Sequence, residues 1–345
     1  MSPESSSPDP PKPPPNNAAL LFPLLIIVIG MVASSLSTPS SLLSEVPLPN
    51  DVMLASFPKS GSFWLRFLVA NISPTARPVN FDSIESLLPD LELGENRRDF
   101  LKIGRVSAAF PRVFKSHQPF VPPGDPRSCG FAERPSKNFD CSKPVAEGGV
   151  GSGMEEYQCL CPNCPGRWRR AVLVVRDGRA ASCSFYHFRS GLNMLETESE
   201  RTFQGFLSSS KSKYGGTWTE WVLSWLDAAE RGDDLKSEPE RTLQDLYSFL
   251  VPDAAPPSGA TLRRAVGASD FGAMKRLEKA EGTGKFFKEL HREATAAGGN
   301  FEIMREGKSG AEAWSSCDDA WSDSDWAASL GGDDYTRAMR LLGYA

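Results

Sequence analysis

Residues 52–70 read VMLASFPKSGSFWLRFLVA, and this stretch decides the fold that the sequence predicts. An apolar run is followed by a short loop that contains Lys59 and Gly61, and then by a helical pattern. The first backbone N–H groups of a helix have no partner within the helix, so they favour an anion in front of them. Lys59 adds a positive charge, and Gly61 lets a phosphate approach the backbone without a Cβ in the way. The stretch predicts a strand, an anion-binding loop and a helix.

A second stretch has the same organisation. Residues 174–184 read VVRDGRAASCS, which is again a β-rich run followed by a helical pattern. Arg176 and Ser184 supply a positive charge and a hydroxyl that suit a second anionic group. One lysine–glycine loop alone is a weak indication, because an ordinary solvated turn can have the same residues. Two such stretches in this order favour a nucleotide-phosphate site.

The two stretches resemble the signatures of the PAPS-dependent sulfotransferases, where PAPS is 3′-phosphoadenosine 5′-phosphosulfate, in the branch usually met as soluble enzymes. The first signature of that family reads roughly Tyr-Pro-Lys-Ser-Gly-Thr-Thr-Trp, and residues 57–64 resemble it, with Phe63 in place of the second threonine. The second signature places an arginine eight residues before a serine, as Arg176 and Ser184 are placed here. The resemblance implies an α/β fold, a three-layer sandwich with a central parallel sheet of the P-loop-like sulfotransferase type.

Two further segments are similar to family motifs. Residues 114–119, FKSHQP, stand in place of a Lys-Thr-His-Leu-Pro segment, and residues 304–310, MREGKSG, are similar to an Arg-Lys-Gly segment. Residues 213–218 and 269–274 resemble two more segments that touch the nucleotide in the family. Four main matches in the family order make the resemblance specific.

The resemblance implies roles for these residues. Lys59 and the amides of the loop after it would hold the 5′-phosphosulfate, and Arg176, Ser184 and Arg305 would hold the 3′-phosphate. The implied catalytic residues are His117, Lys59 and Lys115, with His117 as the base and Lys115 helping to bind the acceptor or the transferred group. The implied cofactor-binding residues are Lys59, Ser60, Gly61, Ser62, Phe63, Trp64, Arg176, Ser184, Tyr214, Ser269, Phe271, Arg305, Glu306 and Gly307.

The expected base is one of three histidines in the chain. A neutral imidazole suits proton transfer near neutral pH. His117 alone has a nearby lysine and proline at the family spacing, whereas His187 is expected to be structural and His291 solvated. Sulfuryl transfer needs mainly in-line positioning and electrostatic stabilisation. The resemblance therefore implies PAPS as the donor, 3′-phosphoadenosine 5′-phosphate (PAP) as the product, and no required metal.

Two departures from the family pattern leave other readings open. Glu306 stands where the family usually has a lysine, and its charge would repel a phosphate unless it points away. Residues 226–246 contain no four-residue apolar run, although the family normally has a buried strand there. Losing that strand would expose a sheet edge, so another strand replaces it, the natural product differs, or the domain is unstable. The alternative function is a catalytically impaired nucleotide-binding or interaction protein; an NTPase is a weaker third reading of residues 307–309.

The N-terminal region predicts a membrane anchor. Residues 18–36 carry no charged side chain and are just long enough for a membrane-spanning helix. Residues 1–17, rich in Pro and Ser, predict a disordered tail, and residues 37–50 a linker before a sulfotransferase domain at 51–345. This arrangement places the catalytic domain in the Golgi lumen. A cleaved signal peptide, a plastid transit segment and a cytosol-facing domain are the alternatives.

Cysteines gather in one part of the chain. Residues 121–167 are rich in Gly, Pro and Ser, and they predict an insertion near the acceptor side of the site. The insertion holds five of the seven cysteines: Cys129, Cys141, Cys159, Cys161 and Cys164. Disulfides in an oxidising compartment or a zinc site at residues 159–164 would stabilise it. Cys183, outside the insertion, is expected to be a small core residue.

The charge of the chain limits its partners. A formal net charge of −5 argues against a nucleic-acid partner. The expected acceptor is a small molecule or glycan with a hydroxyl or amine group, and the sequence does not indicate an oligomeric state.

Overall fold

The computed structural model describes residues 25–30, 50–74, 78–92, 110–120, 168, 170–228, 234–235, 239–282, 284–296, 298, 302–304, 310–317 and 321–344. The predicted tail 1–17 and the insertion 121–167 lie outside these residues, as does the linker 37–50 except for its last residue. The strands are β1 Leu25–Gly30, β2 Val52–Ser56, β3 Val113–Ser116, β4 Arg170–Val175 and β5 Asp234–Leu235. The helices are α1 Ser62–Ile72, α2 Ile84–Leu87, α5 Gly178–Gly191, α6 Phe203–Ser208, α7 Trp218–Ala228, α8 Pro239–Leu250, α9 Gly259–Ala268, α10 Phe271–Glu281, α11 Gly284–Ala296, α12 Asp323–Leu330 and α13 Asp333–Leu341.

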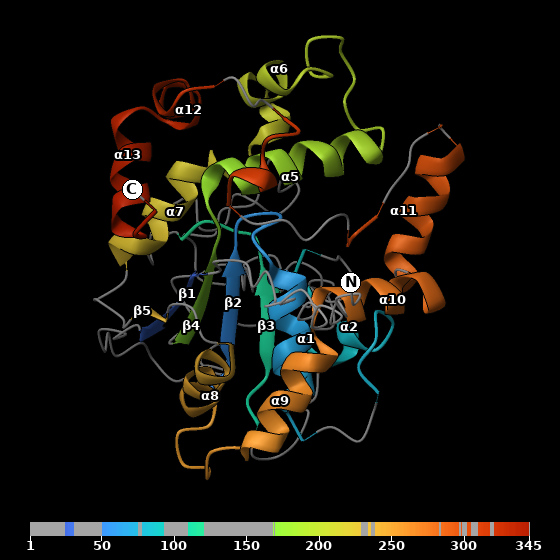
Figure 1. Ribbon diagram of the computed structural model, residues 1–345, viewed down its shortest axis with the longest axis vertical. Helices are drawn as coiled ribbons and strands as arrows, with labels where there is room; N and C mark the ends of the chain where they lie inside the picture. The colour runs from blue at the N-terminus through green and yellow to red at the C-terminus, as the bar shows by residue number, and fades with distance from the viewer. Residues whose placement is uncertain are drawn as a thin grey trace, which may run out of the picture.

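The strands form one mixed sheet in the order β3-β2-β4-β1-β5 (Figure 1). β2 pairs in parallel with both β3 and β4, so the expected parallel sheet is present at this end. β1 is antiparallel to β4 on one side and to the two-residue β5 on the other. The predicted central parallel sheet is thus present in β3, β2 and β4, and β1 extends it with an antiparallel pairing that the sequence did not indicate.

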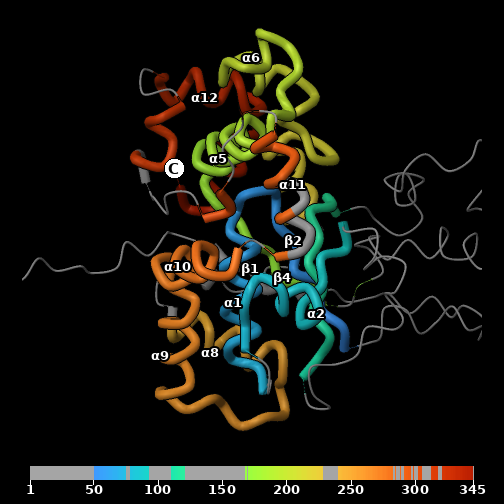
Figure 2. The backbone as a smooth tube through the Cα atoms, turned by 90° about the vertical axis from the view of Figure 1, so that its right-hand side faces the viewer, coloured from blue at the N-terminus to red at the C-terminus, as the bar shows by residue number. Residues whose placement is uncertain are grey.

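Helices cover both faces of the sheet. Met53 and Ala55 of β2 pack in a buried cluster with residues of α5, α6, α7, α12 and α13. Val52 and Leu54, on alternate positions of the same strand, pack in a second cluster with residues of α1, α8, α9 and α10. Figure 2 shows α8 and α9 together at one end of the molecule and α6 and α12 at the other. The predicted three-layer α/β arrangement is confirmed.

The apolar N-terminal segment differs from its prediction. A membrane-spanning helix over residues 18–36 is wrong for residues 25–30, which form β1; residues 18–24 and 31–36 lie outside the described part of the chain. The reason is that the run from Ile26 to Ile29 is entirely β-branched and fits a sheet better than a helix. A short apolar run cannot be assigned to helix or strand by its pattern alone. Within the described residues, none of the helices combines the length and the apolar character needed to cross a bilayer. The Golgi location stays a prediction.

β1 also answers the question of the missing strand. It pairs with β4 over its whole length, from Leu25 opposite Val175 to Gly30 opposite Arg170. Within residues 226–246, the described part of the chain supplies only the short β5, which pairs with β1. Of the three explanations that the sequence allowed, replacement by another strand is therefore the one that the structure shows. The sheet includes residues ahead of the predicted domain start at 51.

Cys183 is more than the small core residue that the sequence predicts. Its side chain in α5 is fully buried, but its sulfur is bonded to Cys317 across a sequence separation of 134 residues. The pattern around Cys183 gave no indication of this disulfide, because the partner is far away in the sequence.

Candidate active site

The two predicted anion-binding stretches meet in the structure. β2 and β4 are parallel neighbours, so the loops that follow them lie at the same edge of the sheet. The Arg176 guanidinium donates a hydrogen bond from Nη1 to the Lys59 carbonyl oxygen at 3.3 Å. A second contact places the Lys59 ammonium over the ring of Phe188 in α5, at 4.7 Å from the ring centre. The structure thus brings Lys59 and Arg176 into one site.

The loop before α1 has the backbone of an anion-binding turn. Lys59 and Gly61 both have left-handed backbone conformations, with φ angles of 65° and 109°. Gly61 is the N-cap of α1, so it directs the first N–H groups of the helix, from Ser62 onward, towards the loop. Ser60 Oγ is buried and has no hydrogen-bond partner among the described residues. Because buried hydroxyls are normally paired, these residues fit an anionic ligand that hydrogen-bonds Ser60.

Phe63 and Trp64, the last residues of the predicted loop set, lie in the first turn of α1 and are half-buried. The Arg66 guanidinium lies 5.3 Å from the centre of the Phe63 ring, and the Phe63 ring also contacts Phe81. Their side chains therefore pack at the start of the helix, and it is their backbone N–H groups that remain suited to an anion.

α5 follows Arg176 directly. Its N-cap is Asp177, whose side chain accepts a hydrogen bond from the backbone N–H of Arg179 and also pairs with the Arg179 guanidinium at 2.7 Å. Ser184 lies in the second turn of this helix and is half-buried. The cap fixes the direction in which α5 leaves β4, and with it the position of Ser184 relative to Arg176.

His117 comes immediately after β3, beside the end of β2. Its Nδ1 lies 2.6 Å from the Ser56 carbonyl oxygen and 3.2 Å from Ser56 Oγ. The hydrogen bond to the carbonyl assigns the ring proton to Nδ1, so Nε2 carries the lone pair. Burial, and then the nearby charge of Lys115, lower the pKa of His117 to about 3. The imidazole is therefore neutral at physiological pH and can accept a proton.

Aromatic residues of α7 and the ring of Tyr214 contact His117 and its neighbour Gln118. Trp221 Nε1 in α7 donates a hydrogen bond to the His117 carbonyl oxygen at 2.7 Å, and Trp225 Nε1 donates to that of Gln118 at 3.2 Å. Both tryptophans are fully buried, as their helical spacing predicts. The ring of Tyr214 contacts the His117 ring edge to face, with centroids 5.5 Å apart. The structure thus places Tyr214 next to the expected base.

Lys115 is engaged differently from its expected role. Its ammonium is buried and forms two ion pairs of 2.8 Å, to Asp90 and Glu92. An isolated bridge between Asp90 and Lys115 and a hydrogen bond from the Leu91 N–H to the Lys115 carbonyl hold the two segments together. The sequence reading missed both acids, because their pairing with β3 is not visible in the local pattern.

Glu92 supports His117 through the backbone. Its Oε1 accepts hydrogen bonds from the His117 N–H at 2.7 Å and from Ser116 Oγ at 2.9 Å. Burial, and the adjacent charge of Asp90, raise the pKa of Glu92 to about 7 although Lys115 opposes the shift. For Asp90, burial acts to raise the pKa, but the charge of Lys115 together with smaller favourable contacts lowers it below the usual range. Near neutral pH, Asp90 is therefore the carboxylate that balances Lys115.

The two shifted groups predict a specific dependence of stability on pH. The His117 pKa falls from 6.5 to about 3 on folding, so stability from this group is lost as pH falls below 6.5. The Glu92 pKa rises from 4.5 to about 7, so stability from this group is lost as pH rises above 4.5. Each slope is about 1.4 kcal/mol per pH unit with opposite sign, and the two cancel where they overlap.

The Glu92→Gln variant should remove one slope and reveal the other. Between pH 4.5 and 6.5, where both groups titrate, we expect its free energy of unfolding to rise with pH by about 1.4 kcal/mol per unit relative to the wild type. His117→Asn should show the opposite trend. Urea denaturation at a series of pH values measures both, and parallel profiles for Glu92→Gln and the wild type would contradict the assignment.

The other residues that were predicted to bind the cofactor lie at the end of α9, in α10 or outside the described residues. Ser269 is fully buried at the end of α9, and its Oγ accepts a hydrogen bond from Asn71 Nδ2 in the last turn of α1 at 3.2 Å. That contact lies nine residues beyond Ser62, or about 13 Å along the helix. Phe271 is the first residue of α10 and packs against the buried cluster that contains Val52 and Leu54 of β2. Arg305, Glu306 and Gly307 lie outside the described residues.

Parts of this sequence are similar to known proteins. A family model described as a sulfotransferase domain matches residues 168–295. Sulfotransferase 1B1 from Mus musculus is 24% identical over 221 residues, which cover 59% of this chain and 58% of the relative. Cytosolic sulfotransferase 3 from Arabidopsis thaliana is 25% identical over 218 residues, which cover 59% and 54%. The chain thus matches less than two thirds of the length of these curated relatives.

One solved structure was also similar: the crystal structure of mouse sulfotransferase SULT7A1 complexed with PAP has a TM-score of 0.46 and 16% identity, covering 88% of this chain and 92% of that one. The family model and the curated relatives support the sulfotransferase family for this chain.

Proposed function

We propose, from the support for the sulfotransferase family, that the protein transfers a sulfuryl group from PAPS to a hydroxyl or amine of a small-molecule or glycan acceptor. The observation that carries the proposal is the hydrogen bond between Arg176 and the Lys59 carbonyl. It joins two loops suited to anions at one edge of the sheet, as a nucleotide with two anionic ends requires. His117 adds a neutral base that a nucleotide-binding protein without catalysis would not need.

The residues of the first loop would hold the anionic group next to the reacting sulfur. The Lys59 charge, the Ser60 hydroxyl, which has no partner in the described part of the chain, and the N–H groups at the start of α1 would stabilise the negative charge that grows on the leaving oxygen. Arg176 and Ser184 would bind the second phosphate and so fix the nucleotide in one orientation. When bound, PAPS supplies the activated sulfuryl group.

His117 would act on the acceptor. Its Nε2 takes the proton from the acceptor hydroxyl while Nδ1–H stays hydrogen-bonded to the Ser56 carbonyl oxygen, which stabilises the imidazolium that forms. Glu92 and Trp221 act on the backbone of His117 and keep the ring in place. Lys115, paired with Asp90 and Glu92, would hold the end of β3 in position next to His117. Its predicted part in acceptor binding stays a prediction.

Calorimetric titration of the full chain with PAP tests the nucleotide site. We expect Arg176→Ala to weaken binding about 10- to 100-fold, since a hydrogen bond to a charged group contributes about 1.5–3 kcal/mol. Arg201→Ala is the matched control, because Arg201 is exposed and its described ion pair is with Glu198. Equal PAP affinity for the wild type and a folded Arg176→Ala protein would contradict the proposed site.

A further inference from the structure

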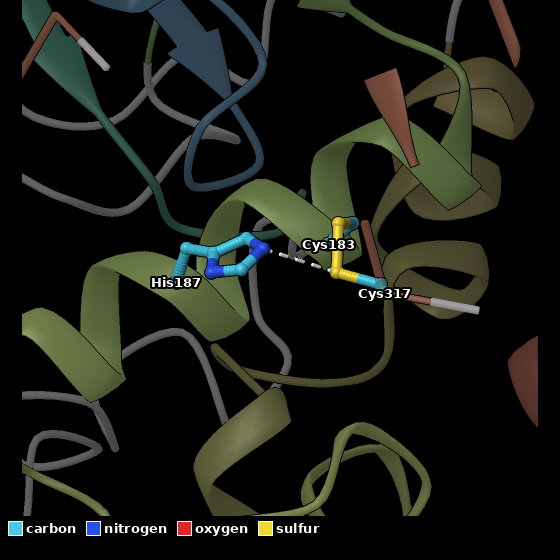
Figure 3. A group of neighbouring side chains, drawn as sticks. All are labelled: Cys183, His187 and Cys317. Carbon is cyan, nitrogen blue, oxygen red and sulfur yellow. Dashed lines mark hydrogen bonds between the residues drawn. A yellow bond between two sulfur atoms is a disulfide. The ribbon is translucent and has the colours of Figure 1, made fainter. Parts of the chain in front are cut away.

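Two cysteines and a histidine converge between α5 and the segment 310–317 (Figure 3). Cys183 and His187 are four residues apart on α5, so they lie on the same side of the helix. Cys317 lies in the facing segment, and its sulfur is bonded to that of Cys183. His187 Nε2 points at the disulfide and lies 3.5 Å from Cys317 Sγ, as the dashed line in Figure 3 marks.

The spacing of these atoms suits a metal ion. One sulfur or nitrogen atom from each residue lies within 4.8 Å of the other two. In a tetrahedral zinc site with bonds of about 2.3 Å to sulfur and about 2.0 Å to nitrogen, sulfur and nitrogen ligands are about 3.5 Å apart. Cys317 and His187 already have this separation. Once the disulfide is reduced, the two sulfurs have to move apart to about 3.8 Å. Cys183 Sγ, which lies within 4.8 Å of the histidine ligand atom, has to take a position about 3.5 Å from it.

The surroundings hold the ligands in place. The Arg179 guanidinium of α5 lies 4.3 Å from the centre of the Trp314 ring, which is a contact between α5 and the facing segment that does not need the disulfide. Within that segment, the Cys317 N–H donates to the Trp314 carbonyl at 2.8 Å and fixes the local turn. Ser316 Oγ is 3.2 Å from His187 Nε2 and 3.8 Å from Cys183 Sγ. A fourth ligand, either this hydroxyl or a water molecule, therefore has a place beside the three others.

We propose that Cys183, His187 and Cys317 bind a zinc ion when the Cys183–Cys317 disulfide is reduced. A dithiol reductant transfers two electrons and two protons to the two sulfurs and is itself oxidised to a disulfide. Zinc then displaces both thiol protons and is bound by two thiolates and the neutral imidazole at Nε2. The two negative charges balance the dication, and thiolate with imidazole is a ligand set typical of zinc.

The oxidised protein with its disulfide and the reduced protein with bound zinc both join α5 to the segment 310–317, through different bonds. Either the disulfide or the metal ties α5, which carries Ser184, to the segment 310–317. In the reduced protein without metal, the connection depends on non-covalent contacts such as those of Arg179 with Trp314 and of His187 with Ser316. The proposal depends on these contacts alone and not on the proposed sulfuryl transfer.

Zinc retention by the reduced full chain tests the site. The protein is reduced with a phosphine under argon, incubated with zinc chloride and desalted, and bound zinc is measured by mass spectrometry of the metal. We expect the wild type to hold one more tightly bound zinc ion per chain than His187→Ala, with the affinity of this site about 100-fold lower in the variant. His291→Ala is the matched control and should equal the wild type. The cysteines of residues 121–167 are the same in all three proteins.

The oxidised protein provides the second arm. Oxidation should remove the same zinc ion from the wild type, and peptide mapping should then find Cys183 joined to Cys317 in both the wild type and His187→Ala. His187→Ala retains both sulfurs, so an intact disulfide shows that the variant is folded at this place. Equal zinc content in reduced wild type and reduced His187→Ala, or in reduced and oxidised wild type, would overturn the proposal.

Discussion

Replacing His117 with asparagine should lower kcat by about 10²- to 10⁴-fold, which is the range for loss of a general base. The affinity for PAP should change little, because the residues that would hold the nucleotide are Lys59, Arg176 and their neighbours. Asparagine retains a donor that can reach the Ser56 carbonyl, so the ring that accepts the proton is lost while the local hydrogen bond can persist. Initial rates of sulfuryl transfer from PAPS to a panel of alcohols, phenols and amines measure the effect.

Two comparisons make the His117 result specific. Trp221→Phe removes the donor to the His117 carbonyl but keeps the base, so we expect a smaller loss, of about 10-fold, with some loss of stability. His291→Ala should retain full activity, since His291 is exposed on α11. Unchanged turnover by a folded His117→Asn protein would mean that another group removes the proton.

Local pattern sufficed for the two strand–loop–helix units. In residues 52–70, the change from an apolar run to a helical pattern marks β2 and α1, and Lys59 and Gly61 between them carry the chemistry of the loop. The parallel pairing of β2 and β4 agrees with the central parallel sheet that the family resemblance implied. These parts of the site could be predicted since each depends on residues that are close in the sequence.

The parts that were missed depend on contacts between distant residues. Lys115 could be matched to the lysine of a family motif, but its ion pairs with Asp90 and Glu92 could not be predicted. They arise from a bridge between Asp90 and Lys115, which are 25 residues apart in the sequence. The Cys183 sulfur finds its partner 134 residues away. Trp221 is buried and has the helical spacing of a core residue, yet its indole N–H also donates to the His117 carbonyl, and helical spacing carries no information about such a hydrogen bond. Secondary structure periodicity predicts which face is buried, not what a buried polar group contacts.

The N-terminal segment shows the same limit most clearly. Residues 18–36 have the length and composition of a membrane-spanning helix, and composition alone cannot reveal that β4 has an edge to be covered. One segment cannot span a bilayer and pair with β4 at the same time. The two interpretations therefore make opposite predictions for a truncated protein.

Deleting residues 1–36 should strongly destabilise the domain, whereas deleting residues 1–17 should not. β1 pairs with β4 at six positions, and if each hydrogen bond of about six contributes about 1 kcal/mol, the loss is on the order of 5 kcal/mol. That is a large part of the 5–15 kcal/mol typical of a domain. The uncovered edge of β4 should also promote aggregation. Thermal unfolding and light scattering of the two truncated proteins measure these effects.

A pair of single substitutions separates strand pairing from the loss of apolar residues. Along an antiparallel strand, successive N–H groups point to opposite sides, so one of Val28→Pro and Ile29→Pro removes a donor to β4 and the other does not. The first should cost about 1–3 kcal/mol more than the second, because it leaves a buried carbonyl of β4 unpaired. An anchor outside the sheet would make the two prolines equivalent, and a 1–36 deletion with unchanged stability would show that β4 does not need β1.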